Sequence, residues 1–300
     1  MNKTPEISVI MPVYNTELFL DKAIKSILEQ SFKNFEFIII NDGSTDASLE
    51  IIQRYKKIDN RIILINRENK GLIHSLNEGI ENSKGEYIAR MDADDISFPN
   101  RFEEQIKLIK KDNADICGSH FFIINEEDEF IDTFIVPLKK RNFLNYLCIT
   151  TPFAHPSVML KKSFLTQNNI QYGQTIYQNA EDYALWVQFW NLGAKFTNVN
   201  AFLFKYRDVK QSLSSEKQKQ IVREKRKISK EMVLNNHKKL LLNYESMDFT
   251  TLSKMEQRLI AVSLMILIKY RLSLKCIKIL LKINKSSILL GIIQFFRVWY

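Results

Sequence analysis

Four short runs of apolar, largely β-branched residues alternate with amphipathic stretches near the N-terminus, and this alternation restricts the fold more than any other feature. The runs occupy residues 7–13, 35–41, 61–66 and 86–92. Their starts lie roughly 25 residues apart, which is the length of a strand, a crossover helix and two connections. Because the runs are continuously apolar, both faces of their sheet should be covered. The spacing therefore predicts an α/β fold with a doubly wound sheet.

The stretches between these runs have the apolar spacing of helices. Residues 17–30 place five apolar side chains on one helical face. Residues 45–57 follow Ser, Thr and Asp residues that can cap a helix, and residues 71–83 begin at a glycine. Further along the chain we expect a helix over residues 99–111 and a strand over residues 115–124. An irregular stretch over residues 125–150 and a helix over residues 180–192 should follow.

Charge is divided unevenly along the 300 residues. Residues 1–204 hold 22 basic and 27 acidic side chains, a net charge of −5, whereas residues 205–300 hold 21 and 7, a net charge of +14. The composition is 45% hydrophobic and 26% charged, which excludes a disordered chain. An acidic body with a basic tail does not fit a nucleic-acid groove, so no nucleic-acid partner is expected.

The cysteines and the N-terminus indicate the compartment. Cys117, Cys148 and Cys276 lie far apart and form no CxxC motif, so neither a disulfide scaffold nor a structural zinc site is expected. The N-terminus lacks the pattern of a secretory signal, and no apolar run reaches 18 residues. We therefore expect a cytoplasmic protein without a conventional membrane span.

Polar and aromatic residues follow three of the four predicted strands. Tyr14 follows the first strand, Asp42 the second, and Asp92, Asp94 and Asp95 the fourth. The carboxyl ends of parallel strands meet at one edge of a sheet, where ligands bind. There Tyr14 could stack on a base, Asp42 could accept a hydrogen bond from it, and the later aspartates could hold Mg²⁺ or Mn²⁺ beside a diphosphate.

Each of these signals also has an ordinary structural explanation. Asp42 lies in a turn-forming sequence, Tyr14 is consistent with a half-buried aromatic, and a DxD triplet often arises by chance. A DxD triplet also marks haloacid-dehalogenase-type phosphotransferases, but in those enzymes it ends the first strand. The sequence contains neither GxGxxG nor GxxxxGK[ST], which excludes a dinucleotide fingerprint and a P-loop.

Taken together, the motifs resemble glycosyltransferase family 2, whose members have the GT-A fold. The resemblance runs in order over about residues 5–210 and rests on PVYN, NDGSTD, GEYIARMDADD, HPSVM and AEDYALW, which begin at residues 12, 41, 85, 155 and 180. It implies a Rossmann-like, mostly parallel sheet with helices on both faces. It also implies an inverting, metal-dependent transfer of a sugar from a nucleotide-sugar, usually a UDP-sugar.

The resemblance assigns roles by position on the donor side. Asp94 would be the direct ligand of Mn²⁺ or Mg²⁺, and Asp92 would contact the ribose or the metal. Pro12, Tyr14 and Asp42 would hold the uridine, and Gly71 would line the same side. The implied donor-binding set is Pro12, Tyr14, Asp42, Gly71, Asp92, Ala93 and Asp94.

Asp182 in AEDYALW matches the catalytic base of the family, and the acceptor side would include Asp95, His155 and Glu181. A displacement at the anomeric carbon needs a carboxylate that takes the proton of the acceptor hydroxyl. The alternative is that Glu181 and Asp182 only complement a helix N-terminus, and that His155 is a structural hydrogen-bonding residue. Arg101 is expected to brace the helix that follows the DADD loop.

Two positions depart from the family pattern. Val209 follows Tyr206-Arg207-Asp208 where the family often has histidine, and Gln188 stands where arginine is usual. These departures concern the contacts to the diphosphate and to the acceptor, not those to the metal or the base.

We expect a catalytic domain over residues 1–212 and a basic, helical extension over residues 213–300. Within the extension, residues 259–268 form an apolar run. On the next predicted helix, lysines occupy one face and aliphatic residues another: Lys275, Lys278 and Lys282, and Leu274, Ile277 and Leu281. The extension could lie on an anionic membrane surface, or its helices could pack on the body or on each other.

The resulting prediction is a hexosyl- or N-acetylhexosaminyltransferase that acts on a hydroxyl of a glycan or lipid-linked acceptor. It would serve polysaccharide biosynthesis and be cytoplasmic or peripheral on the cytoplasmic face of the membrane. One alternative is a catalytically silent, nucleotide-sugar-binding or membrane-associated partner of another transferase. A sugar-1-phosphate nucleotidyltransferase would need a glycine-rich, basic first loop, which PVYNTE does not provide.

Overall fold

The computed structural model describes residues 4–209, 218–270 and 275–299, with side chains up to residue 292. Contacts between Cα atoms divide the chain into two compact units. The first unit comprises residues 1–138, 153–176 and 189–210, and the second comprises residues 139–152, 177–188 and 211–300. The predicted boundary between residues 212 and 213 lies outside the described residues and stays a prediction, and Leu274 lies outside them too.

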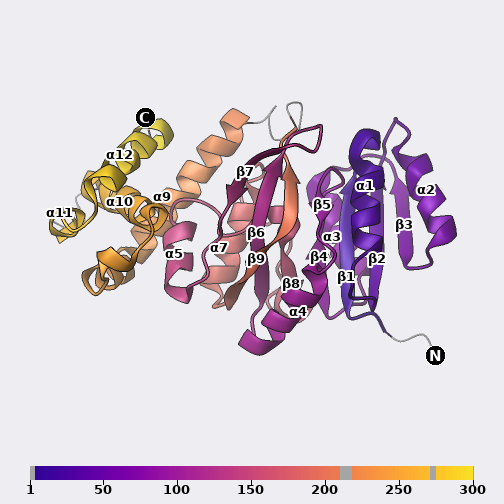
Figure 1. Cartoon of the computed structure of the whole chain (residues 1–300), viewed down its shortest axis with the longest axis horizontal. Coiled ribbons are helices and arrows are strands. Elements are labelled where there is room, and N and C mark those ends of the chain that lie inside the picture. The colour runs from indigo at the N-terminus through magenta and orange to yellow at the C-terminus, as the bar shows by residue number, and fades with distance from the viewer. Residues whose placement is uncertain (1–3, 210–217, 271–274, 300) are drawn as a thin grey trace. The chain divides into compact units, whose positions relative to one another are not determined.

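The first unit is built on one nine-stranded sheet in the order β3-β2-β1-β4-β8-β6-β9-β5, with β7 paired to β6 (Figure 1). Strands β3, β2, β1 and β4 run parallel, β8 lies antiparallel between β4 and β6, and β9 runs parallel to β6. The strands span Ile7–Val13, Phe35–Asp42, Ile62–Arg67, Tyr87–Arg90, Ile96–Ser97, Ile116–Ile124, Phe130–Phe134, Met159–Lys161 and Phe196–Arg207, from β1 to β9.

Helices cover both faces of the parallel strands, as the continuously apolar runs predicted. Successive side chains of a strand point to opposite faces. Val9 packs in one core cluster with Leu20 and Ile24 of α1, while Ile10 faces the other side, where a Cβ atom on Gly79 of α3 would approach its Cγ2 to 2.4 Å. The helices of this unit span Glu17–Leu28 (α1), Ser48–Ile58 (α2), Leu72–Asn82 (α3), Arg101–Asp112 (α4) and Lys162–Gln167 (α6).

The second unit is built from helices and contains no strand among its described residues. Helix α10 is its centre and contacts α5, α9, α11 and α12. A capping box fixes the start of α10, because Ser253 and Glu256 each accept a hydrogen bond from the other's backbone amide. The helices span Lys140–Leu147 (α5), Glu181–Asn191 (α7, whose C-terminal end belongs to the first unit), Gln218–Glu245 (α9), Lys254–Lys269 (α10), Lys275–Leu280 (α11) and Lys285–Trp299 (α12).

One expectation needs correction, and for one segment the structure favours one of two open alternatives. Residues 125–150 are not irregular, because they contain β7 and α5, whose short elements carry too few periodic residues to show in the sequence. For the apolar run 259–268 the structure shows the packing alternative, because the run lies in α10, where eight of its residues are buried: Leu259, Ile260, Ala261, Val262, Ser263, Leu264, Ile266 and Leu267. Among the described helices, none combines the length and apolar character needed to cross a bilayer.

Candidate active site

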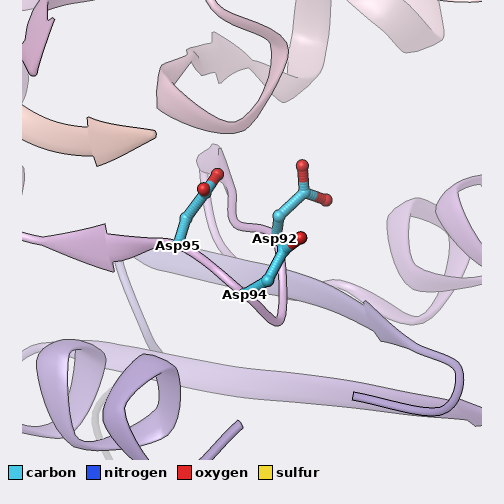
Figure 2. Close-up of side chains that lie close together, drawn as sticks. All are labelled: Asp92, Asp94 and Asp95. Atoms are coloured by element: carbon cyan, nitrogen blue, oxygen red, sulfur yellow. The ribbon is translucent and has the colours of Figure 1, made fainter. Parts of the chain in front are cut away.

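Three aspartates lie together in the loop that follows β4. Carboxylate oxygens of Asp92, Asp94 and Asp95 lie within 4.8 Å of one another, and Figure 2 shows the three side chains on the same side of the loop. Ala93 between them is buried, so it anchors the loop while its neighbours project. Strands β1, β2 and β4 are parallel neighbours, so the loops after all three leave the same edge of the sheet. The structure thus places the aspartates at the edge that the sequence predicted.

The electrostatics of this cluster favour a bound cation. Burial and the neighbouring Asp92 raise the pKa of Asp94 to about 6, and burial together with Asp94 and Asp92 raises the pKa of Asp95 well above its usual range. Asp95 is 1% exposed, and its Oδ2 has no hydrogen-bond partner among the described residues. Crowded carboxylates with a free buried oxygen suit a hard cation such as Mg²⁺ or Mn²⁺.

Two buried arginines support the loop from the side of β4. Arg90 forms an ion pair with Asp92 although Arg90 is only 4% exposed. Arg101 at the start of α4 is fully buried and donates to the carbonyl oxygens of Arg90 at 2.8 Å and Val158 at 3.3 Å. Burial and the charge of Arg90 lower the pKa of Arg101 to about 9. Arg101 therefore holds the end of β4, from which the aspartate loop departs.

Arg207 at the end of β9 supports the loop from the other side. Its backbone amide donates to Asp95 Oδ1, and its Nε donates to the carbonyl oxygen of Asp94, both at 2.7 Å. Its Nη1 donates to the carbonyl oxygen of Asn125 at 2.7 Å, and its Nη2 forms an ion pair with Asp128. The side chain is completely buried, so the Tyr206-Arg207-Asp208 segment fixes the aspartate loop to the turn after β6.

The loops after β1 and β2 hold each other in place. Asn15 adopts a left-handed conformation with φ of 51°, and its Oδ1 accepts from the backbone amide of Thr45 at 2.8 Å. The backbone amide of Glu17 donates in turn to Asp46 Oδ2 at 3.0 Å. Tyr14 is 42% exposed, so its ring is accessible on a fixed backbone. Pro12, the next-to-last residue of β1, is partly buried.

Asp42 is buried and surrounded by donors. Its Oδ1 accepts from the backbone amide of Lys70 at 2.8 Å and its Oδ2 from that of Gly71 at 2.9 Å, and it forms an ion pair with Arg67. A carboxylate has about four acceptor positions, so one remains for an added N–H donor. Gly71 has φ of 88° and ψ of 164°, a conformation that essentially only glycine adopts. The structure therefore brings Asp42 and Gly71 into direct contact.

His155 lies in a buried short helix near the base of the aspartate loop. Its Nε2 lies 2.8 Å from the hydroxyl of Tyr172, and the backbone of Tyr172 is held by the side-chain amide of Asn77 at 2.9 and 3.0 Å. Burial and the charge of Arg90 lower the pKa of His155 well below its usual range. A neutral, hydrogen-bonded His155 supports the structural alternative as well as a site role.

Glu181 and Asp182 lie in the first turn of α7, in the second unit. Both are partly exposed, and Asp182 Oδ1 accepts from the backbone amide of Tyr183 at 2.7 Å. Tyr183 is fully buried, and its hydroxyl donates to the carbonyl oxygen of Leu147 at 2.5 Å. Trp186 one turn later is also fully buried. The helix is thus anchored by aromatic residues while its first carboxylates remain accessible.

Helix α9 fixes the segment that leads into α7. Glu224 accepts from the backbone amides of Asn179 at 2.8 Å and Ala180 at 3.0 Å, and Glu231 accepts from the hydroxyl of Tyr177 at 2.6 Å. The site residues predicted from the sequence did not include Glu224, Glu231, Arg90 or Tyr172. A charged residue at the end of an apolar strand, as at Arg90, is the signal that could have identified that residue.

Comparison with known proteins agrees with the family resemblance and the fold. The family model for glycosyl transferase family 2 matches residues 8–167. The O-antigen biosynthesis glycosyltransferase WbnJ of Escherichia coli is 35% identical over 205 residues, which cover 67% of this chain and 79% of WbnJ.

Two solved structures show the same GT-A fold. S. aureus TarS 1–349 in complex with UDP has a TM-score of 0.59 and 16% identity, over 98% of this chain and 89% of that one. The mannosyltransferase PcManGT of Pyrobaculum calidifontis in complex with GDP-Man and Mn²⁺ has a TM-score of 0.56 and 14% identity, over 98% and 88% of the two chains. With its family match over more than half of its length, the chain belongs to glycosyl transferase family 2 and is a glycosyltransferase.

Proposed function

We propose that the chain is an inverting, metal-dependent transferase that moves a sugar from a UDP-sugar to a hydroxyl of a glycan or lipid-linked acceptor. The observation that carries this proposal is the cluster of Asp92, Asp94 and Asp95 at the sheet edge, where the buried Oδ2 of Asp95 has no hydrogen-bond partner among the described residues. The complexes of TarS with UDP and of PcManGT with GDP-Man and Mn²⁺ support a nucleotide-sugar donor and a divalent cation.

Different residues of the donor site would bind different parts of the nucleotide. Asp42 would accept a hydrogen bond from an N–H of the base at its remaining acceptor position. Tyr14 would stack on the base, beside Pro12 and Gly71. Asp94 would bind Mn²⁺ or Mg²⁺ directly, with Asp92 on the ribose or the same ion. When bound, the cation would stabilise the negative charge that develops on the leaving diphosphate.

Asp182 would act as general base. The acceptor oxygen attacks the anomeric carbon while the bond from that carbon to the diphosphate oxygen breaks, and the hydroxyl proton passes to the Asp182 carboxylate. A single displacement from the face opposite the leaving group inverts the configuration at this carbon. Asp95, His155 and Glu181 are proposed to lie on the acceptor side.

The O-antigen role of WbnJ supports a polysaccharide or lipid-linked acceptor. A lipid-linked acceptor is presented at a membrane surface, and the enzyme would work there as a peripheral protein on the cytoplasmic face. The basic character of residues 205–300 is consistent with such a location.

A donor panel tests the reaction. Release of UDP or GDP from a set of nucleotide-sugars is measured with Mn²⁺ and with a chelator, for wild type, Asp94→Asn and the matched control Asp132→Asn in the exposed strand β7. We expect metal-dependent release of UDP from one donor by wild type and the control, and loss of that release in Asp94→Asn. Wild type that binds UDP by calorimetry yet turns over no donor with any acceptor would instead support a catalytically silent partner.

A further inference from the structure

The C-terminal part of the second unit carries positive charge without any negative charge. Residues 257–300 contain no Asp or Glu. The same stretch contains eight basic residues: Arg258, Lys269, Arg271, Lys275, Lys278, Lys282, Lys285 and Arg297. A surface built from this stretch has no acidic residue of its own that could neutralise it, so it attracts anionic partners.

Helix α11 and the turn after it bury one face in the unit. Cys276, Ile279 and Ile283 are 0%, 3% and 4% exposed, and α11 contacts α10 and α9. The apolar run in α10 is buried by such packing, so it offers no surface to a partner. The outward face of α11 and of the turn after it is therefore the surface that a partner could contact.

That outward face combines aliphatic and basic side chains. Ile277 is 49% exposed and Leu281 is 80% exposed, and the amide of Leu281 donates to the carbonyl oxygen of Ile277 at 3.2 Å. The two residues are therefore one helical turn apart on the same side. Lys278 and Lys282 each follow one of these residues in the sequence, Lys285 begins α12, and all three lysines are exposed.

The lysines on and beside α11 differ in their ion pairs with the described residues. Lys275 forms an ion pair with Glu245 at 3.0 Å. By contrast, the described residues offer no carboxylate in an ion pair with Lys278, Lys282 or Lys285. Exposed aliphatic side chains flanked by unpaired lysines are the pattern of a segment that inserts shallowly among lipid headgroups while its charges contact anionic lipids.

We infer that the face formed by Ile277, Lys278, Leu281, Lys282 and Lys285 docks the protein on an anionic lipid bilayer. This inference rests on the proposed function only for its purpose, which is to bring the enzyme to a lipid-linked acceptor. The binding itself needs neither donor nor acceptor, so it is measured separately from turnover.

Helix α2 supplies a matched control. Lys56, Lys57 and Ile58 at its C-terminal end are exposed, with Ile58 at 75%, but Glu50 and Asp59 lie near them in the sequence. The triple variants Lys278→Gln/Lys282→Gln/Leu281→Ser and Lys56→Gln/Lys57→Gln/Ile58→Ser remove the same charge and one exposed aliphatic side chain each. Neither set includes a residue of the proposed site.

The experiment is co-sedimentation of the full chain with vesicles of phosphatidylglycerol and phosphatidylcholine in equal amounts, and with phosphatidylcholine alone. We expect wild type and the α2 variant to bind the anionic vesicles alike, and the α11 variant to bind about tenfold more weakly or worse. Added salt should weaken wild-type binding.

Several outcomes would overturn the inference. They are absence of wild-type binding to anionic vesicles, equal binding by the two triple variants, and equal binding to neutral and anionic vesicles. Binding of a short DNA duplex as tightly as the vesicles would show a general polyanion site and overturn the lipid assignment. Equal melting temperatures of the three proteins would confirm that the exposed substitutions leave the fold intact.

Discussion

The backbone amide of Arg207 donates to Asp95 Oδ1 at 2.7 Å, so the end of strand β9 is tied directly to the aspartate loop after β4. The same residue binds the carbonyl oxygen of Asp94 through its Nε. Arg207 and Asp95 are 112 positions apart in the sequence. The geometry of the proposed metal site therefore depends on a residue that touches neither the metal nor the donor in the proposed mechanism.

Replacing Arg207 should weaken both the fold and the metal site. In Arg207→Gln the buried loop carbonyls lose their cationic partner, and Asp128 loses one of its two, keeping its ion pair with Lys22. We expect this change to lower the free energy of unfolding by about 3 kcal/mol. Affinity for Mn²⁺, measured by calorimetry, should fall about 10- to 100-fold, as for other residues that orient metal ligands.

The control for Arg207 is Arg54→Gln, which removes an ion pair with Asp21 from an arginine whose side chain is 63% exposed. Its effect on unfolding should stay within about 0.5 kcal/mol, and Mn²⁺ affinity should not change. Arg207→Lys should restore part of the stability and less of the metal affinity, because lysine cannot make the same set of directed hydrogen bonds. An unchanged Mn²⁺ affinity in a folded Arg207→Gln would contradict the positioning role.

Gly71 and Gly193 form a matched pair for the donor site. Both have positive φ, 88° and 82°, and a Cβ atom would meet nothing within 4 Å at either. Each alanine substitution should therefore cost about 1–3 kcal/mol of stability through backbone strain alone. Only Gly71→Ala should also weaken UDP binding, because its amide donates to Asp42. Equal UDP affinity in the two variants would remove Gly71 from the donor site.

Asp182→Asn should separate binding from chemistry. The amide cannot accept the proton of the acceptor hydroxyl, so kcat should fall by about 10²–10⁴-fold. UDP affinity by calorimetry should be the same as in wild type, since the base contacts the acceptor and not the nucleotide. Asp132→Asn serves again as the control. Full turnover by Asp182→Asn would show that the carboxylate only complements the start of α7.

The pKa of His155 makes a prediction for acid stability. Burial and Arg90 depress the pKa in the folded state, so the unfolded chain binds a proton below its pKa of about 6.5 while the folded chain does not. The contribution of His155 to the free energy of unfolding is therefore fully present above about pH 6.5 and is lost as the pH falls below it. Between pH 7.5 and 5.5 this one group should cost about 1.4 kcal/mol.

Urea unfolding at the two pH values tests this expectation. On acidification His155→Gln should lose less free energy of unfolding than wild type, by about 1.4 kcal/mol. Tyr172→Phe removes the hydroxyl near His155 but keeps the imidazole buried, so it should lower stability by about 1 kcal/mol at both pH values. Identical pH dependence in wild type and His155→Gln would show that His155 can be protonated in the folded protein.

Local pattern predicted the elements that are long and periodic. The first four strands and the helices between them lie where the apolar spacing placed them, and the strand near 115–124 is β6. The short strand β8 and the long strand β9 did not stand out. Residues 159–161 are too few to show a period, and β9 has polar residues at several positions, including Asn198 and Asn200. Both strands depend on pairing partners that are distant in sequence.

The α/β class, the edge of the sheet at which Asp42 and the DADD loop emerge, and the family motifs could all be predicted without coordinates, because they follow from local periodicity and the order of residues. Which residues hold that loop, and which apolar segments remain exposed, became clear from the folded structure. Arg90, Arg101 and Arg207 are buried charges whose partners are backbone carbonyls and carboxylates of other elements. The burial of α10 and the exposure of Leu281 likewise depend on which helices pack together. No local pattern specifies such contacts, since they form only when distant segments meet.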